Sequence, residues 1–192
     1  MKNLILLTVL TFFTLTPVIA QVSFGAKAGV NFSDITGPDV DSFTGRTGLF
    51  FGAIAEIDIC ESWALQPELL YSSQGSDYED PGDTGTAKVD YINLPIIAKY
   101  YVADGLSIEA GPQFGFLTSA KFEFDGGEED FKDDLKSIDF GVNFGLGYKL
   151  DNGLNFSARY NLGLTDANDS EDLDGGAEYK NSVIQVGVGF FF

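Results

Sequence analysis

Hydrophobic and polar residues alternate along most of this chain, and the alternation is clearest near its middle. Every second residue from Ile138 to Leu150 is apolar, and the residues between them are three glycines with Asp139, Asn143 and Lys149. A period of two places successive side chains on opposite faces of a β-strand. This segment is therefore predicted to be a strand with one apolar face and one small or polar face.

The same alternation predicts about eight strands. They span residues 23–33, 47–58, 63–73, 88–102, 106–118, 138–150, 154–164 and 181–192. The short turns between them are 60–62, 103–105 and 151–153, and the long loops are 34–46, 74–87, 119–136 and 165–180. Pro67 and Pro95 interrupt two of the strands. Because proline removes a donor from the strand ladder, a local bulge is expected at Pro67.

Long loops and short turns alternate along the chain, which is typical of an outer-membrane β-barrel with loops outside the cell and turns in the periplasm. An even number of strands then puts both chain ends on the periplasmic side. A sheet in lipid has to close on itself, because an open edge would leave backbone groups without hydrogen bonds. The pattern predicts an all-β fold: one closed, antiparallel transmembrane β-barrel of about eight strands with up-and-down topology.

Alternation alone leaves two directions open for the apolar face. In a secreted soluble β-barrel that binds ligands, the apolar face would be the core. Here the opposite face is mostly Gly, Asn, Ser and Gln with isolated charges of both signs, which suits a narrow lumen better than a solvated surface. Aromatic residues of the apolar face also gather at two levels, a pattern typical of the two membrane interfaces. Those near the short turns are Trp63, Tyr100, Tyr148, Phe190 and Phe192, and those near the long loops are Phe32, Tyr71, Phe116 and Phe140.

The first twenty residues have the composition of an export signal. Lys2 precedes the apolar stretch 4–15, Pro17 follows it, and residues 18–20 have the small-residue form of a cleavage site. Residues 1–20 are therefore predicted to be a signal peptide and residues 21–192 the barrel domain, with a retained signal anchor as the alternative. No later stretch approaches the length of a transmembrane helix.

Charge and composition exclude several classes of function. The formal charge is −18, from 29 acidic and 11 basic residues, and there is no histidine. Nothing in such a chain would neutralise phosphates, so nucleic-acid binding is not expected. No recognisable nucleophile and base stand together, so we expect neither an enzyme nor a cofactor. Cys60 is the only cysteine, which excludes an intramolecular disulfide, and it is expected to be a small buried or lipid-facing side chain.

Seven charged residues fall on the face opposite the apolar one, most of them in the half nearest the short turns. They are Lys27, Glu56, Glu68, Lys99, Glu109, Lys149 and Arg159. An unpaired charge in a narrow barrel is costly, so these residues are expected to pair with one another. We interpret them as a salt-bridge plug that closes the lumen. The alternative is a gated or leaky ion path, which would make the protein a narrow porin-like channel for small solutes or ions.

The long loops 74–87, 119–136 and 165–180 are strongly acidic. Their simplest interpretation is a solvated, self-repelling surface. The alternative is weak binding of Ca²⁺ or Mg²⁺, bridging to anionic lipopolysaccharide. Residues 166–170 begin like a calcium-binding loop, but Glu171 stands where such a loop needs glycine, so no metal site is predicted.

Three segments carry a resemblance to a known family. The last strand, with its apolar residues Val186, Val188, Phe190 and Phe192, resembles the C-terminal signal that the barrel-assembly machinery reads in outer-membrane proteins. Together with residues 24–33 and 91–95, it resembles the PorT-like small outer-membrane β-barrels, which are similar in form to the eight-stranded OmpA-type barrel. The resemblance implies a protein of the outer membrane of a Gram-negative-type bacterium, in contact with outer-membrane lipid and lipopolysaccharide. The role that we expect is a structural or surface-interaction scaffold.

Overall fold

The computed structural model describes residues 22–37, 43–80, 83–167 and 179–192. The predicted signal peptide, residues 1–20, lies outside this part of the chain, as does most of the acidic loop 165–180. Among the described residues, no helix is long and apolar enough to cross a membrane.

Nine strands and one short 3₁₀ helix make up the described chain. They are β1 (Val22–Thr36), β2 (Phe43–Cys60), β3 (Trp63–Asp80), β4 (Asp83–Ala103), β5 (Leu106–Phe124), β6 (Gly127–Asp130), η1 (Lys132–Asp134), β7 (Ile138–Lys149), β8 (Leu154–Gly163) and β9 (Lys180–Phe191). All pairings between strands are antiparallel. The short β6 pairs only with the end of β5.

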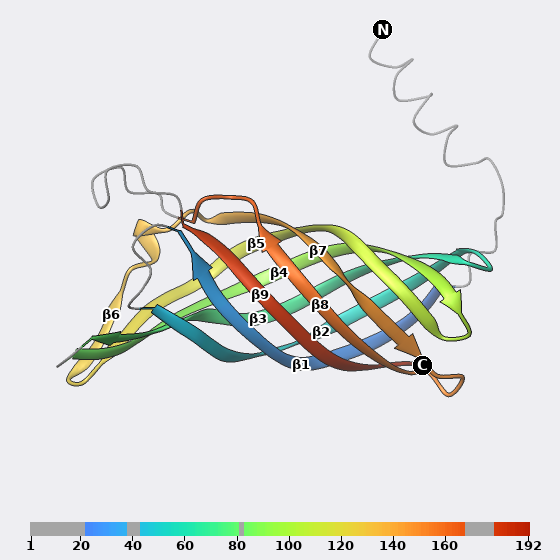
Figure 1. The fold of residues 1–192 in the computed structure, drawn as a ribbon, viewed down its shortest axis with the longest axis horizontal. Coiled ribbons are helices and arrows are strands. Elements are labelled where there is room, and N and C mark those ends of the chain that lie inside the picture. The colour runs from blue at the N-terminus through green and yellow to red at the C-terminus, as the bar shows by residue number, and fades with distance from the viewer. Residues whose placement is uncertain (1–21, 38–42, 81–82, 168–178) are drawn as a thin grey trace, which may run out of the picture.

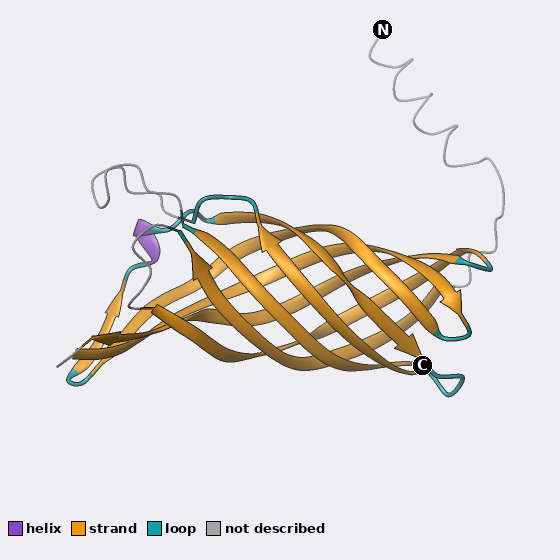
Figure 2. Cartoon of the chain, viewed as in Figure 1, coloured by secondary structure: helices purple, strands orange, loops and turns teal. Residues whose placement is uncertain are grey.

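The other eight strands form a ring (Figure 1). Each of them pairs with two neighbours, since β1 pairs with β9 and β4 pairs with β5 as well as with β3. The C-terminus and the short turns after β2, β4 and β7 lie at one end of this barrel, and η1 and β6 lie at the other (Figure 2). The predicted closed, up-and-down barrel of about eight strands is confirmed.

The strands continue further beyond the long-loop end of the barrel than the sequence predicts. Residues 74–87 are predicted to be a loop, but β3 and β4 stay paired from Trp63 and Tyr100 up to Asp80 and Asp83. The prediction is wrong because this hairpin lies beyond the apolar zone, where water covers its outer face and no alternation is required. The ends of β1 and β2 extend in the same way into residues that are predicted to be loops.

The expected bulge at Pro67 is also absent. The β2–β3 register is the same on both sides of the proline, with Ile54 opposite Glu68 and Ile57 opposite Leu65. The register shifts of this pair of strands lie elsewhere, between Gly45 and Phe50 and between Asp58 and Cys60. Proline has the extended backbone that a strand requires, so it removes a ladder bond without moving the register.

The apolar face of the sheet is on the outside of the barrel. In β9, Ile184, Val186, Val188 and Phe190 are each 43–51% exposed, whereas Gln185 between them is 9% exposed. The same contrast recurs around the ring: large hydrophobic side chains are exposed and polar or charged ones are buried. A soluble barrel would show the reverse. Cys60, at the end of β2, is exposed and free.

Aromatic side chains on this outer face contact one another across strands. The rings of Trp63 and Tyr100 lie 4.9 Å apart near the short turns, and those of Phe114 and Phe140 lie 5.2 Å apart towards the long loops. Cross-strand aromatic pairs of this kind stabilise a sheet, and rings at both interfaces suit the two edges of a bilayer.

Candidate functional site: the charged lumen and its two ends

The inner face of the barrel holds the seven charged residues that the alternation placed there. They are Lys27 on β1, Glu56 on β2, Glu68 on β3, Lys99 on β4, Glu109 on β5, Lys149 on β7 and Arg159 on β8. All of them are buried except Lys149, whose side chain is 26% exposed. Residues far apart in the chain meet because the barrel brings seven strands around one axis.

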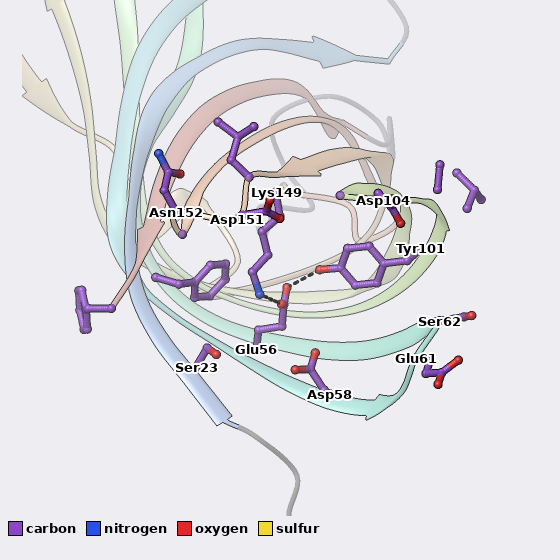
Figure 3. A pocket seen from close by; sticks show the side chains of 17 residues that line it. Ser23, Glu56, Asp58, Glu61, Ser62, Tyr101, Asp104, Lys149, Asp151 and Asn152 are labelled. Carbon is purple, nitrogen blue, oxygen red and sulfur yellow. Dashed lines mark hydrogen bonds and ion pairs between the residues drawn. The ribbon is translucent and has the colours of Figure 1, made fainter.

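Glu56 is the centre of the group nearest the short turns. Its carboxylate accepts hydrogen bonds from Tyr101 Oη at 2.9 Å and from Lys149 Nζ (Figure 3). It also accepts one from Lys99 Nζ at 2.6 Å. Lys149 Nζ also lies 4.8 Å from the centre of the Phe191 ring. Three donors thus satisfy one buried carboxylate, which offsets the cost of removing it from water.

Arg159 is the centre of a second group, deeper in the lumen. Its Nε donates to Glu109 Oε2 at 2.6 Å and its Nη1 donates to Glu68 Oε1 at 2.8 Å. Lys27 Nζ lies 3.8 Å from Glu68 Oε2, and Lys99 Nζ lies 3.8 Å from Glu109 Oε1. Lys99 therefore joins the two groups, and we refer to all seven residues as the charge network.

The charge network holds four cations and three carboxylates with almost no contact with solvent. Apart from Lys149, its side chains are between 0% and 4% exposed. Lys27 Nζ, Glu68 Oε2 and Arg159 Nη2 have no hydrogen-bond partner among the described residues. In such an environment the loss of one partner leaves a buried charge without compensation, so each pair constrains the others.

Large apolar side chains fill the lumen beside the charge network, and the sequence reasoning missed them. Phe50, Ile54, Leu70 and Ile97 are all buried on the inner face. Phe50 fits because glycines face it: a Cβ on Gly187 would lie 2.5 Å from Phe50 Cζ, which is far too close. The alternation of inward and outward residues places these four side chains inside the barrel. Because they are apolar, they cannot be told apart from outward-facing residues in segments where both faces are apolar.

The lumen opens at the short-turn end into a cavity of about 760 Å³, which we call the vestibule (Figure 3). Glu56, Tyr101 and Lys149 line it, and so do residues of all three short turns. Four further carboxylates surround it, none of which forms an ion pair within the described chain: Asp58, Glu61, Asp104 and Asp151.

The long-loop end is covered by an apolar cluster that we call the cap. Val89, Tyr91, Leu117 and Ala120 are buried on the inner face of β4 and β5, and Phe131 and Leu135 pack against them. The β5 strand can bury both Leu117 and Ala120 because its register against β4 shifts there. Backbone bonds hold the covering segment: Phe131 N–H donates to Ala120 O at 3.1 Å, and Leu117 N–H donates to Ser137 O at 2.9 Å.

Beyond the cap, acidic hairpins are partly neutralised by lysines. Lys121 contacts Glu128 at 2.7 Å and Lys136 contacts Asp166 at 3.2 Å. The hydrogen bond to Glu128 raises the pKa of Lys121 above its ordinary value. In the part of the chain that the structure describes, no group of three or more acidic, His or Cys side chains is arranged to hold a metal ion.

The predicted assembly signal lies on the outer face of the last strand. Val186, Val188 and Phe190 point outward from β9, and Phe192 directly follows the strand and is 81% exposed. The Phe192 N–H donates to Phe24 O at 3.0 Å, where β9 meets β1. The strand that resembles the signal is therefore also the one that closes the ring.

Comparisons with known proteins agree with this architecture. The family model described as outer membrane protein beta-barrel domain matches residues 17–169. Among solved structures, the neisserial surface protein NspA has a TM-score of 0.59 at 14% identity, over 89% of this chain and 99% of NspA. Ail, the attachment invasion locus protein of Yersinia pestis, has a TM-score of 0.53 at 15% identity, over 88% and 98%.

A major outer membrane protein from Thermus thermophilus is similar to the same degree, with a TM-score of 0.52 at 13% identity over 90% of this chain and 100% of that one. No curated protein matches the chain. At these identities, the likeness to the solved structures is a likeness of fold.

Proposed function

The chain belongs to the outer membrane protein beta-barrel domain family, and on that premise we propose that it is a closed barrel that serves as a scaffold for contacts at the cell surface. It lies in the outer membrane of a Gram-negative bacterium. Residues 24–33, residues 91–95 and the last strand support a place among the PorT-like barrels within that family. The proposed role includes no catalysis.

The observation that carries the proposal is that buried side chains lie inside the barrel at two levels. The charge network crosses the lumen near the short turns, where Arg159 donates to Glu68 and Glu109 from side chains that are at most 2% exposed. The cap covers the other end. An ion that crossed the barrel would have to separate buried ion pairs and then displace apolar side chains, both of which are costly.

In this proposal the short turns face the periplasm and the long hairpins face the outside, as in other barrels of this type. Residues 1–20 are a signal peptide that is removed on export, which leaves the barrel domain 21–192. The exposed apolar face contacts outer-membrane lipid. The acidic hairpins meet the lipopolysaccharide layer, where divalent cations would bridge the two anionic surfaces.

The last strand supports insertion by the barrel-assembly machinery. Val186, Val188 and Phe190 form a continuous apolar row on the outside of β9, and Phe192 extends it. A row of this kind is accessible to a partner only before lipid covers it, so recognition would precede insertion.

Planar-bilayer recording tests whether the barrel is closed. The purified wild-type protein is expected to show no steady single-channel current, while an open porin in the same bilayer serves as the positive control. A large and steady conductance would overturn the closed scaffold and favour a narrow channel instead.

Epitope insertion tests which end reaches the cell surface. Gly126 lies in the turn between β5 and β6, and its surroundings are open. A tag inserted after Gly126 is expected to bind antibody on intact cells. The matched control is a tag after Asn152, in the short turn between β7 and β8, which should bind only after the outer membrane is permeabilised. The opposite result would reverse the orientation.

A further inference from the structure

Asp139 is the exception among the carboxylates of the lumen. Glu56, Glu68 and Glu109 each contact two cationic side chains. Asp139 is only 7% exposed, yet no lysine or arginine of the described chain forms an ion pair with it. Its Oδ1 atom is buried and has no hydrogen-bond partner within the described residues. A lone buried carboxylate is unstable unless something neutralises it.

The charge network is too far away to do this. Arg159 stands opposite Gly145 on β7, six positions along the strand from Asp139. At about 3.3 Å per residue this is roughly 20 Å. The guanidinium of Arg159 is in any case held by Glu68 and Glu109.

One neutral amide, that of Asn181, hydrogen-bonds the Asp139 carboxylate, and oxygen-bearing side chains lie beside it. The partner of Asp139 across the β5–β7 pairing is Gly115, and the partner of Gly115 on β4 is Asn93. A Cβ on Gly115 would lie 2.9 Å from Asn93 Oδ1 and 3.4 Å from both Asp139 Cβ and Tyr91 Cδ1. The three side chains therefore flank a position that carries no side chain of its own.

Packed side chains lie on both sides of Asp139 along the barrel. Tyr91 belongs to the cap, so Phe131 and Leu135 cover the site from the long-loop end. On the other side, Asn161 donates to Asn143 and Asn143 donates to Gln113, each at 3.3 Å, in a chain of buried amides.

We propose that Asp139 Oδ1 and the amide oxygen of Asn93 coordinate one alkali cation beside Gly115. The ligands are hard oxygen atoms, the type that such ions prefer. The charge also matches, because one carboxylate neutralises one monovalent ion. A divalent ion would leave a positive charge in a buried space, and Ca²⁺ sites normally supply more carboxylates and more ligands.

The first experiment compares cations of equal charge but different size. Wild-type protein is refolded into neutral detergent micelles at pH 8 in NaCl, KCl or N-methyl-D-glucamine chloride at equal ionic strength. Thermal unfolding is then followed by circular dichroism. Because an ion that binds only the folded state stabilises it, the midpoint is expected to be higher in Na⁺ or K⁺ and to rise with its concentration. Equal midpoints in all three salts would overturn the site and leave a proton on Asp139.

Variants locate the effect. Asp139→Asn is expected to unfold at one midpoint in all three salts, and in N-methyl-D-glucamine that midpoint should lie above the wild-type value, since the buried charge is gone. Asn93→Ala keeps the carboxylate but loses one ligand, so the cation concentration for half-maximal stabilisation should rise about tenfold. The control, Asp104→Asn, changes an exposed carboxylate in a short turn and should respond to salt as the wild type does. A salt response retained by Asp139→Asn would contradict the site.

A direct observation does not depend on how the variants fold. Crystals of the wild-type barrel grown in RbCl are expected to show an anomalous peak beside Asp139 and Asn93. No peak there would overturn the proposal, and so would stabilisation by Ca²⁺ but not by Na⁺ or K⁺.

Discussion

In the half of the lumen next to the short turns, every buried carboxylate has two cationic partners, whereas Asp139 in the other half has none among the described residues. The first half is filled by long charged side chains that reach across the axis from seven strands. The second half is filled by short amides, by Tyr91 and by the cap. The two halves of the lumen are thus packed by different chemistries, one that depends on charges from distant strands and one that depends on local contacts.

The two halves should therefore respond differently to single substitutions. A change in the charge network leaves an opposite charge buried, which is expensive. A change in the cap removes apolar contact close to water, which costs less. The largest effect is accordingly expected at the centre of the charge network, and the smallest at the exposed ion pairs of the hairpins.

Arg159→Met should lower the free energy of unfolding by about 3–5 kcal/mol, because it leaves Glu68 and Glu109 with one weaker cationic partner each at 3.8 Å. Unfolding in urea, followed by circular dichroism in neutral micelles, measures the change. Lys88→Met is the control: it breaks a pair with Glu123 in which both side chains are well exposed, so it should cost less than about 1 kcal/mol. Unchanged stability in both Arg159→Met and Glu68→Gln would contradict the claim that substitutions in the charge network cost more than substitutions elsewhere.

Leu135→Ala should cost about 1–2 kcal/mol, because the side chain is only partly buried against the cap. The effect should also be local. Hydrogen exchange is expected to become faster at the amides of Phe131 and Leu135, which bond to Ala120 O and Lys132 O, and to stay unchanged in β8. Equal acceleration in β8 would show that the two halves are one cooperative unit.

Lys149→Met should cost only about 1 kcal/mol, even though Lys149 belongs to the charge network. Its side chain is 26% exposed in the vestibule, and Glu56 keeps its bonds from Lys99 and Tyr101. Urea unfolding of Lys149→Met and Arg159→Met under the same conditions compares the loss in free energy of unfolding that each substitution causes. A loss as large as that of Arg159→Met would show that burial does not set the cost.

Lys121→Met should leave stability at pH 7 without a measurable change, because the Lys121–Glu128 pair is exposed. Glu128 raises the pKa of Lys121 above its ordinary value of 10.5. Any stabilisation from this pair is therefore fully present below about pH 10.5 and is lost as pH rises through the raised pKa. Wild type and variant should therefore have the same stability at pH 7 and in that alkaline range, and a difference that grows with pH would contradict this assignment.

The alternation of apolar and polar residues predicted much of the barrel, because contact with lipid requires apolar residues on the outer face. Wherever the outer face is in the membrane, every second residue is apolar, and this placed all seven charged residues of the network inside. Beyond the membrane the rule no longer applies, so residues 74–87 resembled a loop although they form a hairpin. The bulge predicted at Pro67 is absent because a proline with an extended backbone fits a strand without a change of register.

The partners within the lumen could not be read from the sequence. That Lys99 contacts both Glu56 and Glu109 depends on the relative register of several strands, which alternation leaves undetermined. Phe50 and Ile97 were missed because apolar residues inside the barrel disturb the pattern that defines its outside. Asp139 was visible on the polar face of its strand, but only the structure shows that no lysine or arginine of the described residues pairs with it.

The central claim is that the buried charges of the lumen act as one paired network, and a double-mutant cycle tests it most directly. Arg159→Met, Glu109→Gln and the combination of both are compared with wild type by urea unfolding. Because Arg159 Nε and Glu109 Oε2 lie 2.6 Å apart in a site closed to water, the double variant should be less destabilised than the sum of the single ones, by at least about 1.5 kcal/mol. Destabilisations that simply add would mean that the two charges do not depend on each other, which would contradict the account.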